Sequence, residues 1–186
     1  MPASEAPAGA RPPAKLAHMV VRTARYDETV RWYQTVLGAR VAFGNPMLSF
    51  LTYDDEHHRI AVLNVPGIED PPRVAAGVDH VAFTYATLED LLHTYRRLRT
   101  EGITPYWCIN HGPTTSLYYR DPNGVQIELQ VDNFATDDEL AAWMRSGAFK
   151  QNPIGVEFDP DVLVQRLEAG DPLAELVRQG SAPRPS

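Results

Sequence analysis

Residues 16–22 read LAHMVVR and residues 78–84 read VDHVAFT, and these two stretches decide the fold. Both stretches are short and show the alternating side-chain pattern of a strand. Both also contain the β-branched side chains that are typical of strands. Each carries one histidine at its centre, His18 in the first and His80 in the second. A matched strand with a matched histidine, 62 positions later, indicates an internal duplication.

The residues that follow the two stretches support the duplication. An amphipathic helix is predicted at residues 26–37 and another at residues 88–100, since apolar positions recur there at helical spacing. Gly38 and Gly102 follow as helix stops. The two halves therefore share the order strand, helix and glycine stop.

Three further strands are predicted after each helix, which gives an α+β fold of two tandem βαβββ modules. In the first half these strands are residues 40–43, 48–53 and 59–65, and in the second half residues 105–109, 115–120 and 125–131. An Asp121-Pro122-Asn123-Gly124 turn joins the last two.

Composition shifts divide the chain into five segments. They are a disordered tail at residues 1–15, the first module at 16–65, a Pro- and Gly-rich linker at 66–77, the second module at 78–132, and a helical C-terminal extension at 133–186. The extension is predicted to hold short helices at residues 137–145 and 161–168.

The composition excludes several classes of function. The only cysteine, Cys108, cannot form an intramolecular disulfide, which favours a reducing compartment. Residues 1–15 are not expected to be a signal peptide, because they have no basic start followed by an apolar run of about seven residues or more. No apolar run approaches the roughly 18 residues that would span a membrane. A net charge of −7 offers no basic surface for nucleic acid. We expect a cytoplasmic protein that binds neither membranes nor nucleic acid.

His18, His80 and Glu128 are the candidate metal ligands. Glu128 interrupts the otherwise apolar strand at residues 125–131, and a buried carboxylate needs a cation as partner. Two histidines and one carboxylate with open coordination positions are the donors of non-haem Fe(II) oxygenases. The alternative interpretation is that the histidines are hydrogen-bonded core residues and that the glutamate faces solvent.

With these residues the chain resembles the vicinal oxygen chelate superfamily of extradiol dioxygenases, glyoxalase I, epimerases and resistance proteins, over residues 16–131. The resemblance implies that the modules form a U-shaped mixed sheet around a metal, with ligands on the first and last strands of each module. His18, His80 and Glu128 fall on three of the four ligand positions, and Ala61 falls on the fourth.

Ala61 favours one branch of the superfamily. Glyoxalase I is expected to need protein ligands at all four positions, whereas extradiol dioxygenases use two histidines and one glutamate. The chain, including residues 149–158, is most similar to single-domain type I extradiol catechol dioxygenases. This similarity implies Fe(II), with Mn(II) or another divalent ion as alternatives, an aromatic diol and O2 as substrates, and a possible homo-oligomer.

His58 is the candidate acid/base. Residues 57–63, HHRIAVL, are similar to a His-His-x-Ile-Ala-Phe stretch of dihydroxybiphenyl dioxygenases, in which the second histidine has this role. An imidazole with a pKa of about 6.5 suits proton transfer. Strict alternation from Ala61 would place His58 on the opposite face, unless the strand starts after it or contains a bulge. The alternative is a solvent-exposed polar turn.

Tyr118 and His111 complete the candidate catalytic set. Tyr118 lies ten residues before Glu128, the interval of the dioxygenases' active-site tyrosine, and Tyr119 should face away. His111 is the candidate for a second active-site histidine on a shifted loop, or it is simply exposed. Aromatic and aliphatic side chains that can line a pocket, or equally form the core, are Phe50, Trp107 and Leu117.

Two other functions remain open at this stage. A metal-dependent isomerase, epimerase or lyase of the same superfamily would act without oxygen. A non-catalytic small-molecule binding protein would need no metal, and the trio of His18, His80 and Glu128 argues against it.

Overall fold

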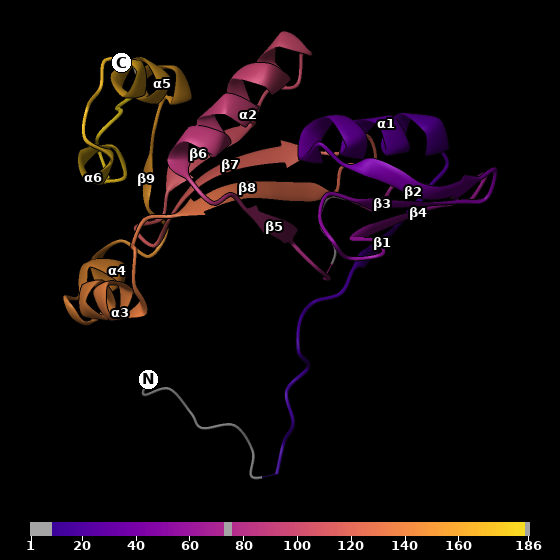
Figure 1. Ribbon diagram of the computed structural model, residues 1–186, viewed down its shortest axis with the longest axis horizontal. Helices are drawn as coiled ribbons and strands as arrows, with labels where there is room; N and C mark the ends of the chain where they lie inside the picture. The colour runs from indigo at the N-terminus through magenta and orange to yellow at the C-terminus, as the bar shows by residue number, and fades with distance from the viewer. Residues whose placement is uncertain (1–8, 73–75, 185–186) are drawn as a thin grey trace.

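The computed structural model describes residues 9–72 and 76–184, and these form two β-sheets and a C-terminal extension. Figure 1 shows the second sheet between the first sheet and the extension. Residues 1–8 of the predicted tail (1–15) and residues 73–75 of the predicted linker (66–77) lie outside the described residues. The predicted α+β class with two βαβββ modules is confirmed.

The first module forms a four-stranded mixed sheet. Its elements are β1 (Met19–Thr23), α1 (Tyr26–Leu37), β2 (Arg40–Asn45), β3 (Leu48–Thr52) and β4 (Ile60–Asn64). The strand order is β1-β4-β3-β2, in which β1 and β4 are parallel and the other pairs are antiparallel. Helix α1 begins and ends as predicted, and Gly38 ends it in the left-handed conformation, with φ 62°.

The second module repeats this arrangement and gains one strand from the extension. Its elements are β5 (His80–Thr84), α2 (Leu88–Thr100), β6 (Trp107–Asn110), β7 (Thr114–Arg120) and β8 (Gln126–Asp132). The order is β5-β8-β7-β6-β9, where β9 (Val156–Glu157) pairs antiparallel with β6. Again the first and last strands of the module are parallel neighbours.

The register of the two sheets confirms the duplication residue by residue. In the first module Ala61 pairs with Val20, and in the second Glu128 pairs with Ala82. Each of these partners lies two positions after a histidine, His18 or His80. However, β1 begins at Met19 and β5 at His80, because the parallel ladders start there. His80 is therefore the first residue of its strand and His18 lies one residue before its strand, so the prediction that they lie at the centres is wrong.

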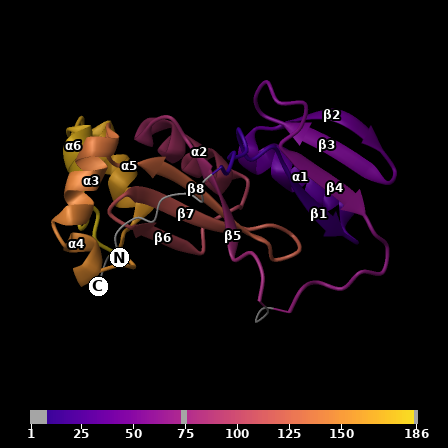
Figure 2. The ribbon, with the colours of Figure 1, turned by 90° about the horizontal axis from the view of Figure 1, so that it is seen from below.

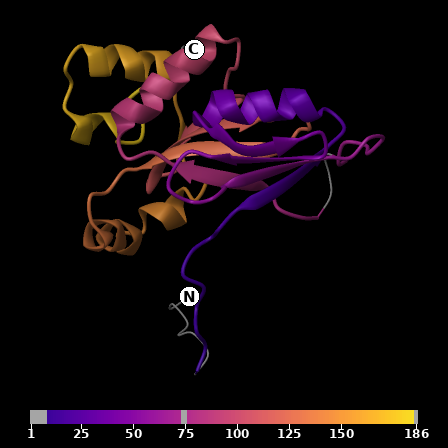
Figure 3. The ribbon, with the colours of Figure 1, turned by 45° about the vertical axis from the view of Figure 1, so that its right-hand side comes forward.

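One face of each sheet is covered by its own helix, and the core lies there. Helices α1 and α2 lie on the same side of the two sheets (Figure 3). The core side chains beneath them include Tyr33, Leu51, Val62, Leu91, Leu117 and Ile127. Leu117 is fully buried in this core, so the core interpretation holds for this residue and the pocket interpretation is wrong. Alternation places Tyr118 and Glu128 on the opposite face of the second sheet from Leu117.

A buried polar network joins the modules through the turn at residues 121–124. Tyr33 donates a hydrogen bond to Asp121 Oδ2 at 3.2 Å, and Thr23 donates to Asn123 Oδ1 at 2.7 Å. The Asn123 side chain also donates to Thr29 Oγ1 at 3.2 Å. Burial raises the pKa of the Asp121 carboxyl. A turn predicted only as a fold marker thus forms part of the contact between the modules.

The extension packs beside the second sheet (Figure 2). It contains α3 (Asp137–Arg145), α4 (Ala148–Gln151), α5 (Pro160–Glu168) and α6 (Leu173–Leu176). The predicted helices at residues 137–145 and 161–168 are confirmed, and the first is started by a capping box between Thr136 and Glu139. Strand β9 and helices α4 and α6 were not predicted, because they are too short for a periodic pattern. No helix in residues 9–72 and 76–184 is long and apolar enough to cross a membrane.

Candidate metal centre and active site

His80 and Glu128 form the centre of the candidate site. His80 is the first residue of β5, and Glu128 lies in the neighbouring strand β8, so the parallel pairing brings their side chains together. His80 Nε2 lies 3.0 Å from Glu128 Oε2, and His80 Nδ1 lies 2.7 Å from Asp79 Oδ2. Only 4% of Glu128 is exposed. A carboxylate so buried needs a cation, and an imidazole nitrogen this close requires a shared proton or a metal ion.

Tyr118 lies beside this pair. It is the cross-strand partner of Glu128 in β7, and its ring meets the His80 ring edge-on at 5.3 Å. Burial, and then the charge of Glu128 and a hydrogen bond to it, raise the pKa of the Tyr118 hydroxyl far above its ordinary value. Tyr118 is therefore a protonated phenol at neutral pH. As predicted, Tyr119 faces away, into the core.

His111 reaches Tyr118 from the loop after β6. Its Nε2 lies 3.0 Å from the Tyr118 hydroxyl oxygen, and its Nδ1 lies 2.5 Å from the carbonyl oxygen of Ile154. Trp107 packs on Tyr118 at 4.9 Å between ring centroids and meets His111 edge-on at 5.7 Å. The loop after β6 therefore holds His111 beside the hydroxyl of Tyr118.

His18 and His58 lie together in the first module. Their rings are 4.3 Å apart, and the His58 ring stacks on Phe50 at 4.2 Å and 11°. Only 8% of His58 is exposed, so the exposed-turn interpretation is wrong for this residue, whereas its neighbour His57 is mostly exposed. Strand β4 begins at Ile60, after His58, and the alternation objection therefore does not apply.

The environment of His58 favours its neutral form. Burial is the largest cause that lowers the pKa of this imidazole, and the nearby His18 and His57 rings lower it further. A neutral imidazole has one nitrogen free to accept a proton, which a general base needs.

The three proposed ligands are not gathered at one point. Within residues 9–72 and 76–184, no three His, Cys, Asp or Glu side chains are arranged to hold a metal ion. The structure brings His80 and Glu128 together, and it places His18 with His58 in the other module. Ala61 occupies the position that corresponds to Glu128 in the repeat and contributes no ligand.

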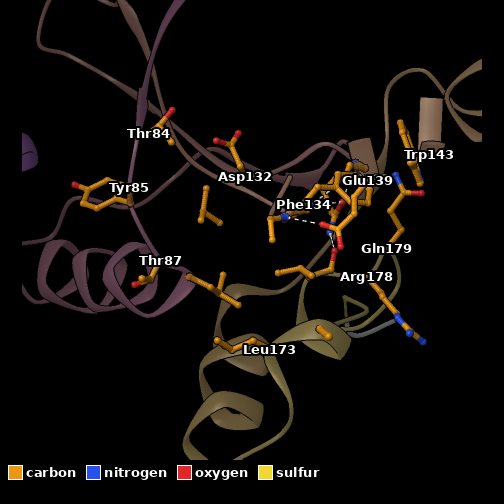
Figure 4. A pocket seen from close by; sticks show the side chains of 18 of the residues that line it. Thr84, Tyr85, Thr87, Asp132, Phe134, Glu139, Trp143, Leu173, Arg178 and Gln179 are labelled. Atoms are coloured by element: carbon orange, nitrogen blue, oxygen red, sulfur yellow. Dashed lines mark hydrogen bonds between the residues drawn. The ribbon is translucent and has the colours of Figure 1, made fainter. Parts of the chain in front are cut away.

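A cavity of about 1310 Å³ opens next to the His111 loop, beyond the ends of β5 and β8 (Figure 4). Helices α2, α3 and α6 surround it, and its lining includes Tyr85, Asp132, Phe134, Trp143 and Leu173. Asn110 and Gly112, on either side of His111, also border it, but no proposed ligand does. We therefore place the candidate chemistry at the His80–Glu128 pair and not in this cavity.

Sequence reasoning missed the contacts that the extension makes with the site. The Ile154 carbonyl contacts His111, and Glu157 accepts a hydrogen bond from Trp107 Nε1 at 2.7 Å. Asp79, which contacts His80, was also missed. The carbonyl could not be found from side-chain types. Asp79 could have been found from the sequence, because it is a charged residue directly before the proposed ligand His80.

Comparison with known proteins identifies relatives of the chain. The chain is 48% identical over 160 residues to biphenyl-2,3-diol 1,2-dioxygenase 2 of Rhodococcus globerulus, which covers 86% of this chain and 84% of that protein. It is 45% identical to biphenyl-2,3-diol 1,2-dioxygenase 3 of the same organism, covering 90% of each.

A solved structure shows the same fold. The crystal structure of a glyoxylase/bleomycin resistance protein/dioxygenase domain from Frankia sp. EAN1pec superimposes with a TM-score of 0.55 at 18% identity, covering 65% of this chain and 99% of that one. The family model of the Glyoxalase/Bleomycin resistance protein/Dioxygenase superfamily matches residues 15–129. On these matches and on its paired βαβββ modules, the chain belongs to the Glyoxalase/Bleomycin resistance protein/Dioxygenase superfamily.

Proposed function

We propose that this protein is an Fe(II)-dependent extradiol dioxygenase that opens the ring of a catechol-type aromatic diol. The observation that carries the proposal is the contact between His80 and the buried Glu128, with the hydroxyl of Tyr118 beside them. The names of the two Rhodococcus relatives, at 48% and 45% identity, favour a biphenyl-2,3-diol as the substrate class. A cytoplasmic location stays a prediction.

The donor chemistry fits a divalent metal. His80, Glu128 and His18 would hold the ion, and Asp79, through its contact with His80 Nδ1, leaves Nε2 as the ligand atom. Because His18 lies with His58, the proposal requires metal binding to bring His18 to the His80–Glu128 pair. A bound iron would supply Lewis acidity and a redox-active centre through which electrons of the diol could pass to O2.

The remaining side chains manage protons and orient the ring. His58, which is buried and stacks on Phe50, would accept a hydroxyl proton from the diol. Tyr118 keeps its own proton and offers its oxygen to a second hydroxyl. Trp107, packed on Tyr118, adds an aromatic surface beside the site.

The test is anaerobic reconstitution with Fe(II), Mn(II) or Zn(II), followed by addition of 2,3-dihydroxybiphenyl or catechol in air. We expect oxygen consumption and a yellow product with Fe(II), and loss of both in His80→Ala and Glu128→Ala. Tight metal binding without oxygen consumption would favour an isomerase, epimerase or lyase. If the chain binds no metal, the remaining hypothesis would be a non-catalytic small-molecule binding protein.

A further inference from the structure

The C-terminal extension reaches the candidate site through one backbone carbonyl. Strand β9 adds to the edge of the second sheet beside β6, and just before it the Ile154 carbonyl oxygen lies 2.5 Å from His111 Nδ1. A carbonyl oxygen only accepts hydrogen bonds, so Nδ1 must carry the proton. In a neutral imidazole this leaves the lone pair on Nε2, which faces the Tyr118 hydroxyl at 3.0 Å.

We propose that the extension is a positioning element of the active site, which holds His111 as its Nδ1-protonated tautomer and thereby fixes the direction of the Tyr118 hydroxyl. The inference deepens the proposed function and rests on it, because His111 and Tyr118 belong to the proposed site. Ile154 acts through His111, and His111 acts through Tyr118. The extension therefore has a role in the chemistry, in addition to covering the sheet edge.

The Tyr118 proton has two acceptors within reach. One is His111 Nε2 and the other is the Glu128 carboxylate. A carboxylate that binds a cation is the weaker competitor, since its lone pairs are engaged. With Nδ1 protonated, His111 Nε2 accepts a hydrogen bond from the Tyr118 hydroxyl, which keeps its proton, and the phenol oxygen turns its lone pairs away from His111. A diol hydroxyl that approaches there can donate to it.

The close approach of the extension depends on Gly155. Its φ is +116°, and an added Cβ would lie 2.3 Å from the Asn110 carbonyl oxygen and 2.8 Å from His111 Cα. Both are backbone atoms that cannot move aside as a flexible side chain can. A larger residue would therefore push the Ile154 carbonyl away from His111.

Two hydrogen bonds between the Asn152 side chain and the Gly155 backbone hold the turn that contains this carbonyl. The Asn152 amide donates to the Gly155 carbonyl oxygen at 2.7 Å, and the Gly155 N–H donates to Asn152 Oδ1 at 2.9 Å. Asn152 contacts none of the proposed ligands in the hydrogen bonds described. It offers a second, milder way to displace the Ile154 carbonyl.

Three other contacts fasten the extension to β6 and its loop. Glu157 accepts from Trp107 Nε1 at 2.7 Å, Asn110 Nδ2 donates to the Val177 carbonyl at 2.8 Å, and Gln179 donates to the Asn110 carbonyl at 3.0 Å. All three contacts are made by Trp107 or Asn110, and they restrict the strand that leads directly into His111. The carbonyl position is thus set by the packed extension and not by a free terminus.

The tautomer can be read directly by NMR. Long-range proton–nitrogen correlation spectra of the full-length chain with isotopically labelled histidine, after a chelator has removed paramagnetic metal, report which ring nitrogen of His111 is protonated. We expect Nδ1–H in the wild type and loss of this form in Gly155→Ala and Asn152→Ala. Gly147→Ala is the matched control, since Gly147 has φ +84° in the same extension with no atom within 4 Å of an added Cβ.

Activity gives the second measurement. Gly155→Ala should lower catechol turnover about 10- to 100-fold with unchanged iron content, and it should add little to Tyr118→Phe in a double mutant. A wild-type His111 protonated on Nε2, or an Nδ1–H signal that persists in both Gly155→Ala and Asn152→Ala, would overturn the inference. The NMR result needs no substrate, so a wild type that consumes no oxygen would refute the proposed function and leave the tautomer assignment standing.

Discussion

His80 Nε2 lies 3.0 Å from Glu128 Oε2 across the parallel strands β5 and β8. The two donors come from the beginning and the end of one module, 48 positions apart, and the ladder brings them together. Replacing the carboxylate with an amide keeps the shape and removes the charge. We expect Glu128→Gln to weaken Fe(II) or Co(II) binding about 100-fold or more, measured by metal titration. Glu28→Gln, on an exposed position of α1, is the control and should bind as the wild type does.

His18 provides a separate prediction. Among the described residues it does not form a three-donor metal site with His80 and Glu128. If metal binding recruits it, His18→Ala should lose metal affinity to a similar degree. His93→Ala, on the exposed surface of α2, should not change it. Equal metal affinity in His18→Ala and the wild type would remove His18 from the ligand set.

The adjacent histidines His57 and His58 differ in burial and should differ in function. His58 is buried against Phe50, while the side chain of His57 is 68% exposed. We expect His58→Ala to lower catechol turnover about 100-fold or more with unchanged metal content, as loss of a general base does. His57→Ala should keep most of the activity. Comparable losses in both variants would mean that the turn, and not the His58 imidazole, is what matters.

The adjacent tyrosines Tyr118 and Tyr119 offer a similar comparison. The Tyr119 hydroxyl is buried and has no hydrogen-bond partner among the described residues. Tyr119→Phe removes this unpaired group, so we expect the free energy of unfolding to rise by about 1 kcal/mol in urea denaturation, with unchanged activity. Tyr118→Phe should instead lower turnover. A destabilised Tyr119→Phe would show that its hydroxyl has a partner.

Asp121 makes the contact between the modules sensitive to pH. Burial raises the pKa of its carboxyl in the folded chain, so the folded state binds its proton more readily than the unfolded state. The stability from this group is complete below the unfolded pKa, about 3.9, and is lost as the pH rises through the higher folded value. The stability of the wild type relative to Asp121→Asn should therefore increase between pH 7 and pH 4, measured by urea denaturation. A decrease over that range would contradict the assignment.

Much of the fold was predictable because it is repeated and periodic. The bounds of α1 and α2 were predicted to the residue, since each helix has a clear apolar face and a glycine stop. The strand ends were less accurate, because ladder pairing and not residue type fixes where β1 and β5 begin. The two-residue strand β9 depends on tertiary contact with β6 and has no local pattern.

The candidate site was predictable where side-chain type carries the signal. His80 and Glu128 were found from strand positions, and Tyr118 was found from the resemblance to the dioxygenases. The three side chains meet in the structure. The Ile154 carbonyl was not, since every residue has a carbonyl and only the folded extension brings this one to His111. The distance between the modules also depends on tertiary packing, and the sequence pattern does not encode where His18 lies relative to His80.

The most direct test of the central claim uses isotopically labelled oxygen gas. The Fe(II)-reconstituted protein is mixed with 2,3-dihydroxybiphenyl under labelled O2, and the product is analysed by mass spectrometry, with Glu128→Gln in parallel. The account predicts a ring-opened acid that carries oxygen atoms from the gas in the wild type and no product in the variant. A product without labelled oxygen, or an unchanged diol in the presence of bound iron, would contradict it.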